Sequence, residues 1–128
     1  MQELVENIIR QADFLLKEQG EFYPFATVLS RNGEIRPLGL LLDTEHPEAE
    51  QVIEQLDMLL EKGIRMGEYQ SAAMGINVVL NTDNVYTSEA LEIRIKPGPD
   101  LTEKTLCLPY ELNRESGELN FGKLISIS

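Results

Sequence analysis

The single histidine of the chain, His46, lies inside a run of acidic residues at positions 43–50. Carboxylates in a short loop are ligands that Ca²⁺ prefers, so this run is the first place to look for a metal site. It lacks the alternating spacing and the central glycine of a calcium-binding loop, and Pro47 stiffens its middle. One histidine also excludes a metal site built from several histidines of one chain. Helix capping explains these acids, and we therefore expect no metal and no cofactor.

The single cysteine, Cys107, lies between two leucines, where a thiol usually behaves as a small buried hydrophobic group. A reactive thiol needs exposed, electropositive surroundings and a base, and His46 is the one imidazole available. One cysteine also excludes a disulfide within the chain and any zinc site built from cysteines. We therefore expect no catalytic residue. An enzyme that uses carboxylates or Cys107 is kept as an alternative.

The glycines and serines give no catalytic or phosphate-binding motif. None of the nine glycines takes the spacing of a dinucleotide-binding or nucleotide-binding loop. No serine lies in a G-x-S-x-G nucleophile elbow. Two carboxylates that meet across a cleft would suit glycoside hydrolysis, but no pair stands out. The motifs therefore favour a binding protein over an enzyme.

Charge is the most unusual property of the sequence, with a net value of −11. Phosphate backbones and anionic membrane surfaces would be repelled by it, so we expect neither nucleic acid nor membrane as a partner. A basic protein would be attracted and steered by the same field. Solubility alone is the alternative explanation for such an acidic composition.

Aromatic residues are a second feature of a binding surface. Tyr23 lies in the cluster Phe22-Tyr23-Pro24-Phe25, and Tyr110 follows a proline. Either tyrosine would serve as an interface anchor if it faced out beside the acidic run, because exposed aromatics are enriched at interfaces. The alternative for Tyr23 and its neighbours is the start of a strand that faces the core.

The elements that must position these residues follow from hydrophobic periodicity. Asn32-Gly33 predicts a two-residue hairpin loop in which Arg31 faces Glu34. Apolar residues at helical spacing predict two helices, and alternating or continuous apolar runs predict six strands. The helices are predicted at 2–18 and 47–65, and the strands at 22–29, 35–42, 71–80, 91–96, 105–112 and 119–127. We therefore expect an α+β fold of order α-ββ-α-ββββ, with both helices on one face of an antiparallel sheet.

Length and composition place this fold in one domain, residues 1–128. The acidic start has no basic segment followed by an apolar run, so we expect no signal peptide. The longest apolar stretch is far shorter than the roughly 20 residues that a membrane span needs. Together with the single cysteine, these features lead us to expect a soluble cytoplasmic protein.

Several short segments resemble a family of small uncharacterised bacterial α+β proteins. They are Glu21-Phe22-Tyr23-Pro24-Phe25-Ala26, Arg31-Asn32-Gly33-Glu34-Ile35-Arg36-Pro37, the strand that begins at Ala72-Ala73, Leu108-Pro109-Tyr110 and Phe121-Gly122-Lys123. The resemblance runs along most of the chain. It implies a compact bacterial α+β domain, and it implies no catalytic or binding residue.

Our leading hypothesis is a non-catalytic protein-binding module, for example an immunity-type inhibitor of a basic partner protein. Asp43, Glu45 and Glu48 at the start of the second helix would steer the partner, and Tyr23 would anchor it. A small-ligand sensor with a pocket between sheet and helices is the alternative. An apolar sheet edge or face would also allow two copies to pair, so a homodimer stays open.

Overall fold

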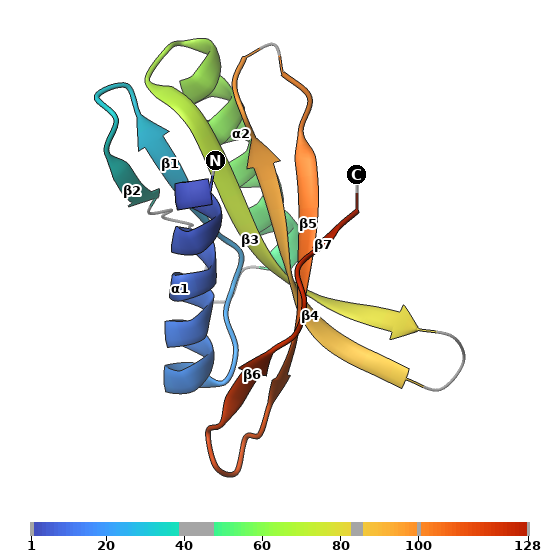
Figure 1. Ribbon diagram of the computed structural model, residues 1–128. Helices are drawn as coiled ribbons and strands as arrows, with labels where there is room; N and C mark the ends of the chain where they lie inside the picture. Colours follow the sequence, from blue (N-terminus) through green and yellow to red (C-terminus); the bar gives the residue numbers. More distant parts are fainter. Residues whose placement is uncertain (1, 39–47, 83–85, 100, 128) are drawn as a thin grey trace.

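The computed structural model describes residues 2–38, 48–82, 86–99 and 101–127. Within these ranges it contains two helices and seven strands (Figure 1). In chain order they are α1 (Gln2–Gln19), β1 (Phe25–Ser30), β2 (Ile35–Leu38), α2 (Ala49–Arg65), β3 (Tyr69–Thr82), β4 (Tyr86–Lys96), β5 (Lys104–Leu112), β6 (Leu119–Phe121) and β7 (Ile125–Ser126). The predicted α+β class is confirmed, and the predicted helices agree with α1 and α2 to within two residues.

All described strand pairs are antiparallel, in the sheet order β2-β1-β3-β4-β5-β6, with β7 also paired to β5. The predicted last strand is two strands, which makes seven in place of six. Both pair with β5, but residues 122–124 between them leave the ladder. The break begins at Gly122, whose amide donates to the carbonyl oxygen of Pro109 at 2.7 Å. Pro109 has no amide hydrogen to donate in return, so regular pairing stops there.

The two helices lie on opposite faces of the sheet, and the expectation of one shared face was wrong (Figure 1). Neighbouring residues of β3 show this directly. Ala73 packs in the hydrophobic core between the sheet and α1, which we call the core under α1. Ala72 packs in the core between the sheet and α2, which we call the core under α2. Successive side chains of a strand point to opposite faces. Residues 71–76 are buried without a polar alternation, so β3 needs a cover on both sides.

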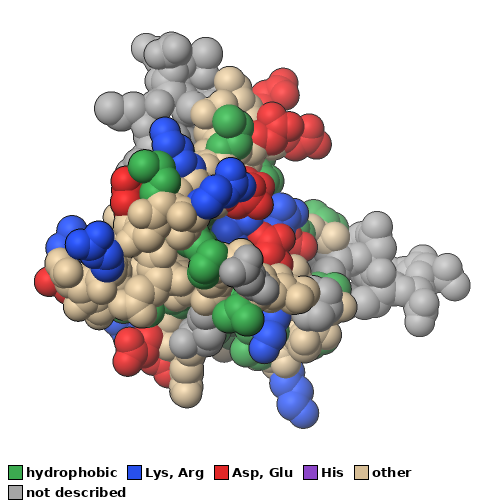
Figure 2. Space-filling model, turned by 90° about the horizontal axis from the view of Figure 1, so that it is seen from above, with side chains coloured by type: hydrophobic (Ala, Val, Ile, Leu, Met, Phe, Trp, Pro, Cys, Tyr) green, Lys and Arg blue, Asp and Glu red, His purple; other side chains and the backbone are tan. Residues whose placement is uncertain are grey.

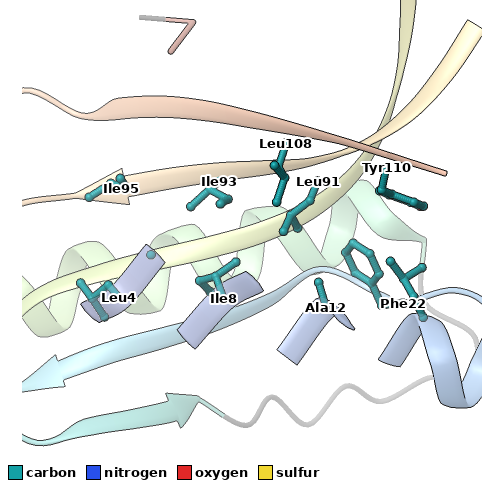
Figure 3. Packing of buried hydrophobic residues seen from close by; sticks show 11 residues of the cluster. Leu4, Ile8, Ala12, Phe22, Leu91, Ile93, Ile95, Leu108 and Tyr110 are labelled. Atoms are coloured by element: carbon teal, nitrogen blue, oxygen red, sulfur yellow. The ribbon is translucent and has the colours of Figure 1, made fainter. Parts of the chain in front are cut away.

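The core under α1 joins the helix to the middle of the sheet (Figure 3). Leu4, Ile8, Ala12 and Leu16 recur every four residues and are all buried, which makes one apolar stripe along α1. A polar connection fixes the helix beside β1. The Thr27 hydroxyl donates to Oδ1 of Asn7 at 2.9 Å and accepts from Nε2 of Gln11 at 2.6 Å.

The core under α2 is aliphatic and lies against β1 and β3. Its helical side is formed by Val52, Leu56, Leu60 and Ile64, and its sheet side by Ala26, Val28, Ala72, Met74 and Ile76. At the end of α2, the Tyr69 ring lies against Gly63 and occupies the space that a side chain at this position would need. Gly67, with a φ of +77°, then turns the chain directly into β3.

The β1–β2 hairpin has a three-residue loop, and the predicted two-residue loop was wrong. The Gly33 amide donates to the carbonyl oxygen of Ser30 at 3.0 Å, and the Ser30 amide donates to that of Glu34 at 2.8 Å. Gly33 has a positive φ of +86°, which suits the last position of a three-residue loop. Glu34 consequently pairs with Arg36 in place of the predicted Arg31.

Candidate functional site

The exposed side of α2 carries a straight column of carboxylates. Glu50, Glu54, Asp57 and Glu61 are spaced four, three and four residues apart, which places them on one side of the helix. We call these four residues the acidic column. Glu50, Glu54 and Glu61 are exposed, and Asp57 is half-buried on the side that faces β4.

Two apolar side chains of α2 stand exposed, Met58 next to the acidic column and Leu59 on the opposite flank of the helix. Met58 is 66% exposed and Leu59 is 41% exposed, although both lie in the middle of a helix on which Val52, Leu56, Leu60 and Ile64 are buried. Met66, just after the helix, is 63% exposed. Single exposed apolar residues are ordinary, but a group of them on one helix among charges is typical of a binding surface.

Lys96 lies next to the acidic column and is buried. It is the last residue of β4, on which Leu91, Ile93 and Ile95 face the core under α1. Alternation along the strand therefore directs Lys96 to the α2 side. Its Nζ lies 2.7 Å from Oδ1 of Asp57 and 3.4 Å from Oε1 of Glu61, and it also donates to Glu103.

These partners favour the protonated form of Lys96. Burial lowers the pKa of the Lys96 ammonium, but hydrogen bonds and charge from Asp57 and Glu103 outweigh this, so the pKa is raised above its ordinary value of 10.5. Lys96 therefore stays positive at physiological pH. Each of its three protons has a carboxylate acceptor, which accounts for the whole donor capacity of the group.

The same three carboxylates are close enough together to be considered as metal ligands. Single oxygens of Asp57, Glu61 and Glu103 lie within 4.8 Å of one another. The Lys96 ammonium lies among these oxygens, so a metal ion there would meet a positive charge within hydrogen-bonding distance. The geometry fits a network around a buried lysine better than a metal site.

A cavity of about 420 Å³ opens beside this network, between the end of α2 and the β4–β5 connection. Among the described residues, its walls are part apolar and part charged: Glu61, Ile64, Arg65, Lys96, Gly98, Pro99, Leu101 and Glu103. Figure 2 looks onto this end of the molecule and shows basic and acidic side chains side by side over its middle. The volume is large enough for a small metabolite.

The sequence-predicted partner-binding residues are only partly described by the structure. Asp43 and Glu45, like His46, lie outside the described residues. Glu48 is exposed directly before α2, and its side chain makes no capping hydrogen bond. Tyr23 is 55% exposed between α1 and β1, and within the described ranges no hydrogen bond or ion pair joins it to Glu48. Their role in binding stays a prediction.

Tyr110 and Cys107 are both buried. The Tyr110 hydroxyl donates to Oδ1 of Asn77 at 2.7 Å, so Tyr110 is a core residue and its proposed role as an interface anchor was wrong. Burial raises the pKa of the Cys107 thiol, as does the negative charge of Glu92. The prediction that Cys107 is a buried hydrophobic group is confirmed. A raised thiol pKa does not suit a nucleophile.

Comparison with known proteins adds no family or function. No family model, no curated protein and no solved structure matches the chain. Of the resemblance described above, the α+β architecture alone is confirmed. Neither described helix is long and apolar enough to cross a membrane.

Sequence reasoning did not find Lys96 or the acidic column. The sequence contains the column as a spacing of four, three and four residues within a predicted helix. The prediction, however, was placed on the acids that precede the helix. No sequence signal places Lys96, because a lysine at the end of an alternating strand is usually exposed. Its burial depends on α2 crossing the same face of the sheet, which only the tertiary structure shows.

Proposed function

We propose that this protein is a non-catalytic binding module that recognises a basic partner protein through the exposed side of α2. The observation that carries the proposal is the acidic column on one flank of α2, with Met58 exposed next to it and Leu59 exposed on the opposite flank. A central apolar contact within a charged rim is the usual arrangement of a protein interface. The net charge of −11 extends the same attraction over the whole molecule.

In this proposal the charges and the apolar residues have different tasks. The acidic column would accelerate association with a basic partner, and Met58 and Leu59 would exclude water once the surfaces meet. Lys96 neutralises one negative charge of the column but leaves Glu50 and Glu54 beyond its reach, nearer to the start of the helix. Binding alone would inhibit the partner by covering its working surface, as an immunity-type protein does.

Self-association through α2 is a weaker fit, because each copy would bring the same net charge of −11 to the contact. The surface is therefore better suited to a partner of opposite charge.

The test is capture of a partner on the immobilised protein from lysate of the source organism, followed by mass spectrometry. We expect one basic protein to be retained at a stoichiometric level and to be released by salt. The double variant Glu50→Lys/Glu54→Lys should lose at least 90% of the captured partner. The matched control is Glu3→Lys/Glu18→Lys, which makes the same change in net charge at exposed positions of α1.

Equal loss with both double variants would show that net charge alone governs retention. It would exclude α2 as the specific binding surface. Met58→Ser/Leu59→Ser tests the apolar contact separately, because it leaves the charge unchanged. These two substitutions should speed dissociation with little effect on association. Retention of no protein at all would contradict the proposed function.

A small-ligand sensor is the second candidate, and the cavity beside Lys96 is the observation that favours it. A ligand would lie against Ile64 and Leu101 and meet Lys96 and Arg65 at the charged wall. Screening metabolites by thermal shift tests this, since a ligand that binds only the folded state raises the melting temperature saturably. Leu101→Asp should abolish the shift if the ligand occupies this cavity.

We further propose that the protein acts in a bacterial cytoplasm. The family resemblance and the single, buried Cys107 support this, because cytoplasmic proteins keep their thiols reduced. Fractionation of source cells, with detection by an antibody against the protein, tests the location. Recovery in the secreted fraction would contradict it.

A further inference from the structure

Lys96 is the one buried side chain with a charge in the described part of the chain. Its side chain is 7% exposed, while those of its partners Asp57, Glu61 and Glu103 are 44%, 53% and 58% exposed. The network therefore holds a buried cation under three carboxylates that still reach water. It also joins three parts of the chain, namely β4, α2 and the segment before β5.

Stability alone does not account for this arrangement. Buried ion pairs can often be replaced by apolar residues with no loss of stability, because removing the charges from water offsets their attraction. A methionine at position 96 would keep an unbranched side chain of similar length beside the aliphatic core under α2. The charge of Lys96 therefore calls for a role in structural specificity, which is the best-attested use of buried polar groups.

The contacts of α2 show what kind of specificity is needed. One end of the helix is anchored lengthwise, because Tyr69 packs on Gly63 and a short turn leads into β3. Between α2 and the sheet, the remaining core contacts are made by apolar side chains, among them Val28 of β1 and Met74 of β3. Such contacts have no direction of their own, so they oppose a small rotation of the helix about its axis less sharply than a directional bond does.

The two helices differ in the polar groups that oppose such rotation. On α1, Asn7 and Gln11 form hydrogen bonds with the buried Thr27 of β1 beneath the helix. On α2, the described connection of this kind is Lys96, which reaches from β4 to Asp57 and Glu61, one turn apart on the side of the helix. A contact at the side of a helix opposes rotation, because turning the helix about its axis moves that side chain away from its partner on the sheet.

We infer that Lys96 is a positioning residue that fixes the rotation of α2 about its own axis. It thereby determines which side chains of α2 face solvent. Rotation towards β4 would turn the acidic column inward and expose Leu59 further, whereas the opposite rotation would bury Leu59 on the far flank of the helix. The consequence for partner recognition rests on the proposed function, but the rotation itself does not.

The test measures the distance between spin labels on the two helices by double electron–electron resonance. Labels are attached to cysteines at the exposed positions Gln19 of α1 and Gln55 of α2, in a Cys107→Ala background. Side chains lie at a radius of about 5–6 Å from the helix axis, so a rotation of about 20° moves them by about 2 Å. Lys96→Met should broaden or shift the distance distribution by about this amount.

Three further variants separate positioning from other effects. Lys17→Met removes a cation from an exposed ion pair with Asp13 on α1, and it should leave the distribution unchanged. Lys96→Arg retains the charge and should keep most of the wild-type sharpness. The neutral variant Lys96→Met/Asp57→Asn/Glu61→Gln/Glu103→Gln removes repulsion between the carboxylates and should broaden the distribution as Lys96→Met does.

An unchanged distribution in Lys96→Met would overturn the inference. A neutral variant as sharp as the wild type would also overturn it, because carboxylate repulsion would then explain the single variant. If neither variant folds, Lys96 contributes stability and not positioning. Because these measurements use the isolated protein, their outcome is independent of whether any partner is captured.

Discussion

Replacing Tyr110 with phenylalanine tests the electrostatics of the core under α1. Burial raises the pKa of Tyr110 to about 12, assisted by the charge of Glu89 and opposed by Arg114 and by the hydrogen bond with Asn77. The side chain is 3% exposed. At neutral pH, Tyr110→Phe loses one hydrogen bond and should lower the free energy of unfolding by about 1 kcal/mol.

The pH dependence gives the sharper expectation. An unfolded chain loses the tyrosine proton near pH 10, whereas the folded state keeps it to about pH 12. The unfolded state therefore binds fewer protons in this window, and stability falls as the pH rises. At pH 11 the loss attributable to Tyr110 reaches up to about 1.4 kcal/mol, the equivalent of one pH unit. Tyr110→Phe has no phenol to ionise at this position and therefore escapes this loss of stability.

The assay is urea unfolding of the wild type and Tyr110→Phe at pH 9, 10 and 11. The wild type should be the more stable at pH 9, and the difference should have vanished or reversed by pH 11. Tyr23→Phe is the control, because it removes the hydroxyl of a tyrosine that is more than half exposed and lies outside the core under α1. A difference between wild type and Tyr110→Phe that stays constant across this range would refute the reasoning.

Three further predictions concern packing and reactivity. Ile8→Ala and Leu60→Ala should each lower the free energy of unfolding in urea by about 2–5 kcal/mol. Their effects should add, because the two residues lie in separate cores, and strong coupling would contradict a sheet with one helix on each face. Gly75→Ala should cost about 1–3 kcal/mol, because the new Cβ would lie 2.7 Å from the Phe25 ring; a neutral result would show that the ring can move. Cys107 should react with a thiol reagent at pH 8 only after unfolding in urea, and rapid labelling of the folded protein would restore the thiol enzyme as a hypothesis.

Elements whose pattern is local were predicted correctly from the sequence. The four-residue spacing from Leu4 to Leu16 specifies α1 whatever the rest of the chain does, and the alternation in residues 91–96 specifies the second part of β4, which begins at Tyr86. Placing the second helix was a different problem, because it depended on Ala72 and Ala73 being covered on both faces of β3. An apolar run does not show whether helices pack on one face of the strand or on both.

The candidate site was less accessible from sequence than the fold. Acidic residues were recognised as the main feature, but the prediction centred on Asp43 and Glu45, which lie outside the described residues. Lys96 became important only because β4 ends beside α2. A side chain that acquires its partners from three parts of the chain leaves no short motif for sequence reasoning to find.

The sheet order has a consequence for the folding pathway. Most described neighbours in the sheet are joined by hairpins, whereas β1 and β3 are separated in sequence by β2 and α2. Pairing β1 with β3 therefore closes a much longer loop. The entropic cost of this loop closure is offset only when α2 packs across both strands. We expect the β3–β4–β5 hairpins to form in the transition state and the β1–β3 seam after it, so Val28→Ala should mainly accelerate unfolding while Ile93→Ala slows folding.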